Sequence, residues 1–323
     1  MSVTPGRFSK LPHLALRGIA SLMDLTDLLT LSLMSPKFNY AVGFLNYPVL
    51  KLKWIISAPG HFVIRIIQQN QPDIILKFVL QVCSLKFVSS GVLVDGLKIE
   101  ISRIGQSFVL RCGSSDLEKP RVFEAFTEFL LKICKPETFD FCSNLYIGSI
   151  FDHTRKFETF KLSHQKLDIE CAKLIFEGIE ADIFKLEGIQ IYTQDFQVFQ
   201  LKHREMDLGD APWLSSESFK NITCEILKYN QNKLKAHHIQ SSDIVHVAKS
   251  WLSGEFENLK KIEIYLPRIY QPREELYKIR VEVDSELRKL GGVEVGEQMI
   301  LTQDGGKQAR TNVISSMWTF SVL

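Results

Sequence analysis

The most constraining feature of this sequence is the way short strand-like and helix-like segments follow one another through most of its length. The segment FETFKLS at 157–163 is strand-like, and the helix-like DIECAKLIFEGI at 168–179 comes directly after it. Nearer the C-terminal end, the helix-like SSDIVHVAKSWL at 241–252 precedes the alternating KKIEIYL at 260–266. Strands interspersed with helices favour an α+β or α/β fold, in which helices pack on a sheet.

The spacing of these strand-like segments drifts along the chain. It falls within the roughly 20–50 residues that stacked repeats occupy. We therefore expect degenerate strand–turn–helix units lying side by side, in the manner of irregular leucine-rich repeats. No strict LxxLxLxxN repeat is present, so a compact α/β domain with a mixed sheet is the alternative.

The N-terminal part is different, because its segment LPHLALRGIASLMDLTDLLTLSLMS at 11–35 is rich in leucine. Pro12 suits the start of one helix, Asp24 can cap a second, and Ser35 with Pro36 can begin a third. The second of these helices is apolar on nearly every side. Its apolar surface exceeds what a small bundle can bury by itself. We predict a small helical module at residues 1–46, followed by a larger α/β domain at 47–323.

Three segments carry a resemblance to a known family. The stretch LPHLALRGIASLMDLTDLLTLSLMSPKF at 11–38 resembles an F-box, and is similar in particular to those of the nematode proteins that combine an F-box with an F-box-associated domain. The stretch VAKSWLSGEFENLKKIEIYL at 247–266 resembles the Trp-containing signature of that associated domain. The closing segment at 300–323 resembles its C-terminal hairpin, with Asp304-Gly305-Gly306 as the turn.

This resemblance implies a substrate-recognition subunit of an SCF-type (Skp–cullin–F-box) ubiquitin ligase. Its F-box would bind a Skp-type adaptor and, through it, a cullin, while the C-terminal domain binds a target protein. The adaptor-contacting positions that the resemblance carries over are Leu11, Pro12, Leu16, Ile19, Leu25, Leu28, Leu29, Leu31 and Ser32. Such a subunit is not an enzyme, and it is intracellular, in cytoplasm or nucleus.

The target and the residues that bind it are not indicated by the sequence. Aromatic side chains between the repeat-like units are candidates for target binding. The alternative is that they are ordinary core residues. These aromatic residues are Tyr192, Phe196, Phe199, Trp213 and Tyr229.

A second interpretation stays open, in which the chain is a non-ligase α/β interaction scaffold whose N-terminal helices pack on its own core. The exposure of Leu25, Leu28 and Leu29 distinguishes the two interpretations. Exposed leucines are expected of an adaptor-binding receptor, and buried leucines of the scaffold.

Charge and hydropathy argue against a nucleic-acid-binding protein and against a membrane-spanning protein. The net charge is only +2, so we expect no electrostatic nucleic-acid binding. No apolar run approaches the roughly 18 residues of a membrane-spanning helix.

The cysteines form no CxxC pair and lie among apolar neighbours, as reduced core cysteines of an intracellular protein do. They are Cys83, Cys112, Cys134, Cys142, Cys171 and Cys224.

Motifs that would indicate catalysis or a cofactor are not found. The sequence contains no GxSxG nucleophile motif, and Gly305-Gly306-Lys307 lacks the spacing of a phosphate-binding loop. The histidines His237, His238 and His246 have no cysteine or carboxylate at a recognised zinc-ligand spacing. We therefore expect no catalytic residue, no cofactor and no metal. An unrecognised hydrolase would require a deep pocket with a buried group of shifted pKa.

Overall fold

The fold is described from a computed structural model. It describes residues 11–43, 45–57, 61–79, 90–94, 97–111, 118–191, 201–209, 216–220, 222–230, 241–265, 273–314 and 317–323. The chain divides into two compact units, Met1–Thr154 and Arg155–Leu323. The predicted boundary between residues 46 and 47 lies inside the first unit, and the independence of residues 1–46 as a module stays a prediction.

The first unit begins with three short helices: α1 (His13–Ala20), α2 (Leu25–Met34) and α3 (Pro36–Val42). The Asp24 carboxylate accepts a hydrogen bond from the backbone N–H of Asp27 at 2.8 Å. The Ser35 hydroxyl accepts one from the N–H of Phe38 at 3.3 Å, with Pro36 in the first turn of α3. Each contact satisfies a backbone donor that a helix start leaves without a partner. The predicted caps at Asp24 and Ser35 are confirmed.

A sheet follows in the same unit. Its strands are β1 (Tyr47–Ser57), β2 (His61–Ile67), β3 (Ile74–Val79), β4 (Ser90–Val94), β5 (Leu97–Ile104), β6 (Ser107–Arg111) and β7 (Cys134–Ser143). Their order across the sheet is β7-β1-β2-β3-β6-β5-β4. Strands β1 and β2 form an antiparallel hairpin, whereas β1 pairs with β7 in parallel. The sheet is therefore mixed.

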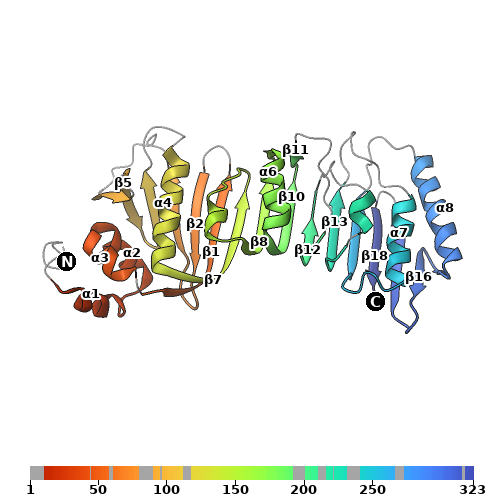
Figure 1. Ribbon diagram of the computed structural model, residues 1–323, viewed down its shortest axis with the longest axis horizontal. Coiled ribbons are helices and arrows are strands. Elements are labelled where there is room, and N and C mark those ends of the chain that lie inside the picture. Colours follow the sequence, from red (N-terminus) through yellow and green to blue (C-terminus); the bar gives the residue numbers. More distant parts are fainter. Residues whose placement is uncertain are drawn as a thin grey trace. The chain divides into compact units, whose positions relative to one another are not determined.

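Helix α4 (Glu118–Ile133) covers one face of this sheet, and the short α5 (Ile150–His153) follows β7 (Figure 1). The Phe123 ring of α4 lies 5.4 Å from that of Phe62 on β2 and 5.2 Å from that of Phe78 on β3. The indole N–H of Trp54 donates to the buried Thr127 hydroxyl at 3.1 Å. Aromatic packing and one satisfied polar contact thus join helix to sheet.

The second unit contains a larger sheet. Its strands are β8 (Lys156–Ser163), β10 (Glu180–Glu187), β12 (Glu205–Asp207), β13 (Ile226–Asn230), β14 (Lys261–Tyr265), β15 (Val293–Val295), β16 (Gln298–Thr302), β17 (Gln308–Ile314) and β18 (Met317–Val322). The order is β15-β16-β17-β18-β14-β13-β12-β10-β8. Strands β9 (Lys166–Leu167) and β11 (Gln190–Ile191) form a separate parallel pair. The helices are α6 (Ile169–Lys173), which continues as the π-helical η2 (Leu174–Gly178), the 3-10 helix η3 (Ser216–Lys220), α7 (Ser241–Leu252) and α8 (Arg273–Lys289).

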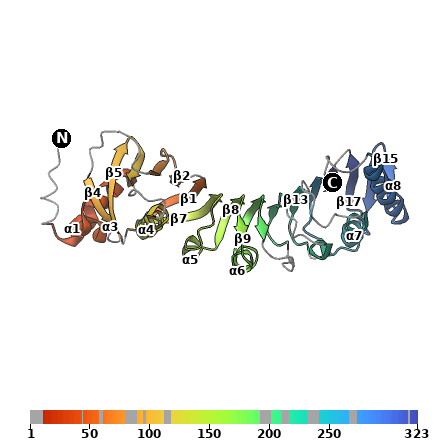
Figure 2. The same ribbon diagram turned by 90° about the horizontal axis from the view of Figure 1, so that it is seen from above.

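Strands β8, β10, β12, β13 and β14 are parallel neighbours in the order of the chain. Parallel neighbours require a crossover between them, and α6 and α7 lie in two of these connections. Both helices lie on the same face of the sheet (Figure 2). The buried residues that pair across these strands beneath them are Phe160, Phe184, Met206, Leu227 and Ile262. These buried side chains form an apolar row that crosses the five parallel strands under the helices.

The remaining strands, β15 to β18, are joined in antiparallel pairs. Gly305 and Gly306 have φ of +115° and +85° in the connection between β16 and β17, so the predicted hairpin turn is confirmed. Trp251 of α7 is fully buried, with its ring 5.4 Å from that of Phe320 on β18. Trp251 is therefore a buried link between α7 and the sheet.

The structure is thus a mixed α/β fold, dominated by sheet, with helices at the N-terminal end. The coarse fold class expected from the sequence is confirmed. Among the described residues, none of the helices combines the length and the apolar character that crossing a bilayer requires.

Candidate functional site

The predicted adaptor contacts fall into three groups by exposure. Leu16, Leu25, Leu28, Leu29 and Ser32 are buried. Leu11, Ile19 and Leu31 are half-buried, and Pro12 is exposed. A buried side chain cannot contact another protein unless the helix separates from its own chain. Most of the predicted set therefore serves the interior of the first unit.

Polar contacts attach α2 to the hairpin formed by β5 and β6. The Thr26 hydroxyl donates to the side-chain carbonyl of Gln106 at 2.5 Å. The Arg103 guanidinium lies 2.8 Å from the Asp27 carboxylate and also donates to Thr30 at 3.3 Å. The ion pair is partly exposed, so it contributes little to stability by itself. Together these contacts hold α2 against its own chain, as the scaffold interpretation expects.

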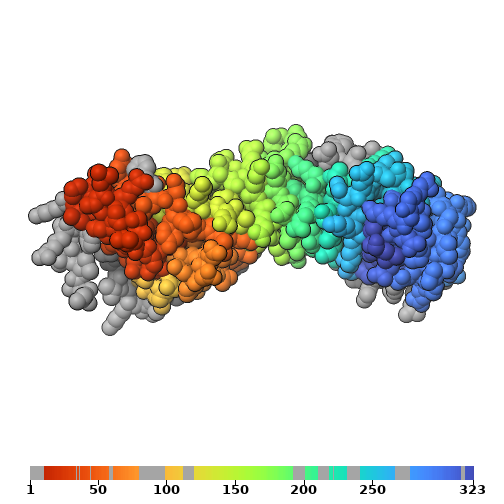
Figure 3. All heavy atoms as spheres, turned by 90° about the horizontal axis from the view of Figure 1, so that it is seen from below, coloured from red at the N-terminus to blue at the C-terminus, as the bar shows by residue number. Residues whose placement is uncertain are grey.

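Other apolar side chains of the N-terminal helices remain at the surface. Leu14 is 83% exposed, Leu22 is 89% exposed and Tyr40 is 64% exposed. The rings of His13 and Tyr40 meet edge to face at 5.3 Å, which brings the start of α1 beside α3. Figure 3 shows these helices, in red, open to the surface of the first unit. These exposed positions are available to a partner.

The predicted set missed these exposed residues. The sequence held a usable signal, because Leu16, Ile19, Ala20 and Met23 recur at the three- and four-residue steps of one helix face. Leu14 falls off that face. An apolar residue outside the buried stripe of an amphipathic helix is the one left for solvent or a partner.

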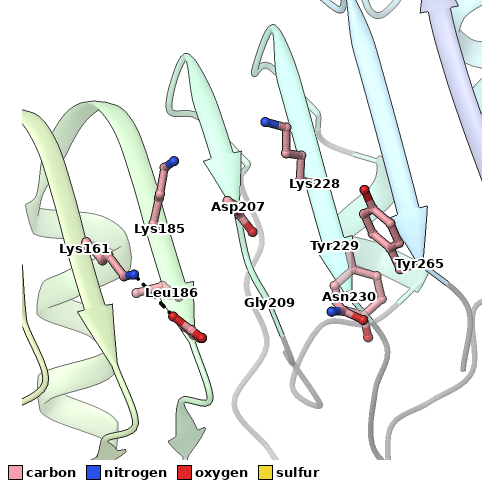
Figure 4. Close-up of a pocket in the computed structure, with 10 residues that line it drawn as sticks. Lys161, Lys185, Leu186, Asp207, Gly209, Lys228, Tyr229, Asn230 and Tyr265 are labelled. Atoms are coloured by element: carbon pink, nitrogen blue, oxygen red, sulfur yellow. Dashed lines mark ion pairs between the residues drawn. The ribbon is translucent and has the colours of Figure 1, made fainter. Parts of the chain in front are cut away.

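The second unit carries a hollow of about 370 Å3 on the sheet face opposite α6 and α7. The residues that line it are Lys161, Lys185, Leu186, Glu187, Asp207, Gly209, Lys228, Tyr229, Asn230 and Tyr265 (Figure 4). They come from β8, β10, β13 and β14 and from the end of β12. Side chains alternate between the faces of a strand, so the lining lysines point away from the buried row.

Gly209 lines this hollow where the chain passes close to β10. Its φ is +48°, and a Cβ atom built there would lie 2.7 Å from the carbonyl oxygen of Leu186. The N–H of Asn230 donates to the Gly209 carbonyl at 2.9 Å, so the backbone continues beside β13. Glycine therefore lets the chain pass close to β10, where a side chain would collide with the β10 backbone.

Two of the three lysines in the hollow have carboxylate partners. Lys161 lies 3.3 Å from Glu187, and Lys228 lies 3.2 Å from Glu205. Partial burial by itself lowers the pKa of Lys228, but the hydrogen bond to Glu205 and the charges of Glu205, Glu263 and Asp207 raise it above its ordinary value. Lys185 has no ion pair with any residue in the described part of the chain.

Of the aromatic candidates for target binding, only Tyr229 can be located. Its side chain is buried, although part of it reaches the wall of the hollow. Tyr192, Phe196, Phe199 and Trp213 lie outside the described residues. Tyr265, which the sequence reasoning did not single out, is 42% exposed at the other end of the hollow.

The titratable groups with large pKa shifts are core residues. Burial raises the pKa of Cys134 and of Cys224 to about 12, which keeps both thiols protonated and unreactive. Cys142 and Cys171 are half-buried, and Cys83 and Cys112 lie outside the described residues.

His203 is a buried core histidine. Burial, with the charge of Lys202, lowers its pKa to about 4. Its ring stacks on Phe184 at 4.2 Å, and its Nδ1 accepts the N–H of Ala181 at 3.2 Å. The imidazole is therefore neutral and structural at physiological pH.

Within the described ranges, no group of three or more histidines, cysteines and carboxylates could hold a metal ion. His246 is half-buried on α7, and His237 and His238 lie outside the described residues.

The chain was compared with protein-family models, with curated proteins and with solved structures, and none of the three comparisons finds a significant match.

Proposed function

We propose that this protein is a non-catalytic substrate-recognition subunit of an SCF-type ubiquitin ligase. The observation that carries the proposal is the combination of the F-box-like segment at 11–38 with apolar side chains that the three N-terminal helices and the turn after α1 leave exposed. Leu14, Leu22 and Tyr40 lie at the surface, with Pro12 exposed beside them. The contact to a Skp-type adaptor is assigned to these side chains and to the half-buried Leu11, Ile19 and Leu31.

The target-binding role is assigned to the second unit. The parallel strands β8 to β14 with α6 and α7 on one face support a domain of irregular leucine-rich-repeat-like units. Their other face carries polar side chains and a hollow. A receptor of this kind contributes proximity, because it holds a target near the activated ubiquitin and raises its effective concentration. Ligase chemistry then belongs to other subunits, and the complex works in the cytoplasm or the nucleus.

A second candidate function is an interaction scaffold that recruits no ligase. The burial of Leu25, Leu28 and Leu29 favours it, because these leucines were expected at the surface of an adaptor-binding receptor. The two candidates differ in one measurable property, which is binding to the adaptor.

The test is co-precipitation of the full chain with a recombinant Skp-type adaptor. Replacing Leu28 or Leu29 is unsuitable, because a charge at a buried position unfolds the helices whatever they bind. We choose the double variant Leu14→Asp with Leu22→Asp, since both side chains are exposed. Its matched control is Tyr277→Asp with Val281→Asp, which places the same charges at two exposed apolar positions of α8.

Wild type and the α8 variant should bind the adaptor, and the variant with Leu14→Asp and Leu22→Asp should lose binding with an unchanged far-UV circular dichroism spectrum. Interface energy is concentrated in a few apolar anchors, so charges at two of them are enough to abolish binding. A folded wild-type chain that does not bind at micromolar concentration would leave the scaffold as the function. Equal binding by both double variants would remove Leu14 and Leu22 from the interface.

A further inference from the structure

The hollow on the sheet face of the second unit has the features of a binding site. Its described lining contains three lysines and two carboxylates, Glu187 and Asp207, and Lys228 is paired with the neighbouring Glu205, so Lys185 is the lysine of the lining without an ion pair to a described residue. Its volume of about 370 Å3 lies at the lower end of the roughly 300–1,000 Å3 of ligand pockets. The space suits one or two side chains with their backbone.

Lys161 and Lys185 stand directly opposite each other on β8 and β10. Like charges in this position repel each other and destabilise the strand pair. Glu187 neutralises Lys161 at 3.3 Å, whereas Lys185 lacks an ion pair within the described residues. An anionic ligand would give Lys185 the ion-pair partner that none of the described residues provides.

Lys185 is accompanied by a second ammonium group. In Figure 4 the side chains of Lys185 and Lys228 both extend towards the upper end of the hollow, with Asp207 on the strand between them. Glu205 occupies only part of the hydrogen-bonding capacity of Lys228, since an ammonium group has three donors. A carboxylate at this end would therefore meet two cations.

The other polar groups of the hollow match a peptide backbone. Asp207 has no ion pair in the described part of the chain and can accept a backbone N–H, and the Asn230 amide and the Tyr265 hydroxyl can donate to a carbonyl. From β8 to β14 the lining spans four strand spacings, about 19 Å at roughly 4.8 Å each. An extended peptide covers this distance with about six residues, at roughly 3.3 Å per residue.

We propose that this hollow binds an extended, acidic segment of the target protein, with Lys185 pairing one Asp or Glu side chain of that segment. This inference rests on the proposed function, because it specifies which class of target the receptor recognises. Charge complementarity selects the acidic side chain, and the small volume admits only one or two such groups.

The test measures fluorescence anisotropy of labelled hexapeptides mixed with the full-length chain. One peptide alternates glutamate with glycine, and two matched peptides carry glutamine or lysine in place of glutamate. Alternation suits the hollow, because successive side chains of an extended peptide point to opposite sides. The variants are Lys185→Glu and Lys185→Met, and thermal melts check that each is folded.

The control variant is Lys173→Glu, which makes the same charge change on α6, on the helix-covered face of the same sheet. Lys173 is exposed and lies 3.6 Å from Glu170. The glutamate peptide should bind wild type more tightly than the other two peptides do, and more weakly as salt is added. Lys185→Glu should weaken binding by about tenfold or more, because a charge-assisted hydrogen bond is replaced by repulsion. Lys185→Met should weaken it less, and the control should stay within about twofold, as a screened surface charge does.

Several outcomes would overturn the proposal. Equal binding of the glutamine peptide would mean that charge is not recognised. Tighter binding of the lysine peptide would assign the hollow to a cation at Asp207. Displacement of the peptide by inorganic phosphate, with the same dependence on Lys185, would make it a site for a small anion. Unchanged binding by Lys185→Glu would remove Lys185 from the site.

The same samples are tested for co-precipitation with the adaptor, so the two proposals can fail separately. Lys185→Glu should keep wild-type adaptor binding, because the lysine lies in the second unit. Peptide binding without adaptor binding would leave the acidic-segment site standing and refute the ligase receptor. Adaptor binding without peptide binding would support the ligase receptor and refute the acidic-segment site.

Discussion

Replacing Trp251 by alanine should lower the free energy of unfolding of the second unit by about 3–5 kcal/mol. The indole is fully buried between α7 and the sheet, with its ring 5.4 Å from that of Phe320. A tryptophan buries about 150–250 Å2, which at roughly 25 cal/mol per Å2 corresponds to about 4–6 kcal/mol before subtracting what alanine retains. A cavity left by incomplete relaxation adds to this loss.

A comparison with Trp318 separates packing from hydrogen bonding. The indole N–H of Trp318 donates to the buried Thr311 hydroxyl at 2.8 Å, whereas that of Trp251 has no partner among the described residues. Both tryptophans can be changed to phenylalanine, which keeps an aromatic ring. Trp318→Phe should destabilise more than Trp251→Phe by about 1–2 kcal/mol, because it leaves the Thr311 hydroxyl without this partner.

The measurement is urea unfolding followed by far-UV circular dichroism, with the slope of the transition compared among variants. A shifted midpoint with an unchanged slope shows that stability changed while the surface exposed on unfolding did not. A loss below about 1 kcal/mol for Trp251→Ala would refute the reasoning, since a buried aromatic side chain cannot be that inexpensive to remove. Trp251 would then have to be exposed in solution and available to a partner.

Two further predictions concern His203 and the glycines. The pKa of His203 is about 4 in the folded chain and 6.5 in the unfolded chain, so the unfolded state binds the additional proton. The contribution of neutral His203 to the free energy of unfolding should therefore be fully present above pH 6.5 and should fall by up to about 3 kcal/mol as the pH drops towards 4. Urea titrations across this pH range should show the loss of stability. The variant His203→Phe should lose less stability over the same range. Gly209→Ala should destabilise by about 1–2 kcal/mol or more, because φ is +48° and the new methyl group meets the Leu186 carbonyl. Gly18→Ala should instead stabilise by about 1 kcal/mol, since Gly18 lies in α1 with open space around it. Thermal melts in which both alanine variants shift the melting temperature in the same direction would contradict this reasoning.

Features encoded within a few residues could be read from the sequence. Asp24 and Ser35 cap helices because the donor and the acceptor lie three residues apart. The glycines at 305 and 306 mark a hairpin because only their backbone freedom allows φ of this sign without strain. The apolar face of α4, with Phe123 and Phe126, follows from helical periodicity alone.

The tertiary structure decided which apolar side chains remain available. Leu25, Leu28 and Leu29 read as an excess for a small bundle, and they are buried in a unit where α2 also contacts the β5–β6 hairpin. Thr26 and Gln106, which make one of these contacts, are eighty residues apart. Periodicity places Leu14 off the apolar face of its own helix, but it describes one helix at a time and does not indicate that the rest of the chain covers Leu25, Leu28 and Leu29.

The hollow is the clearest case of a feature that sequence reasoning cannot find. Its lining residues run from Lys161 to Tyr265, and they are brought together by the register of parallel strands separated by helices and loops. Each lysine by itself reads as an ordinary solvated charge. The sequence determined the strands, the caps and the turns, because those depend on neighbours in the chain; the pairing of Lys161 with Lys185 and the open space beside Gly209 depend on neighbours in space, which only the folded sheet defines.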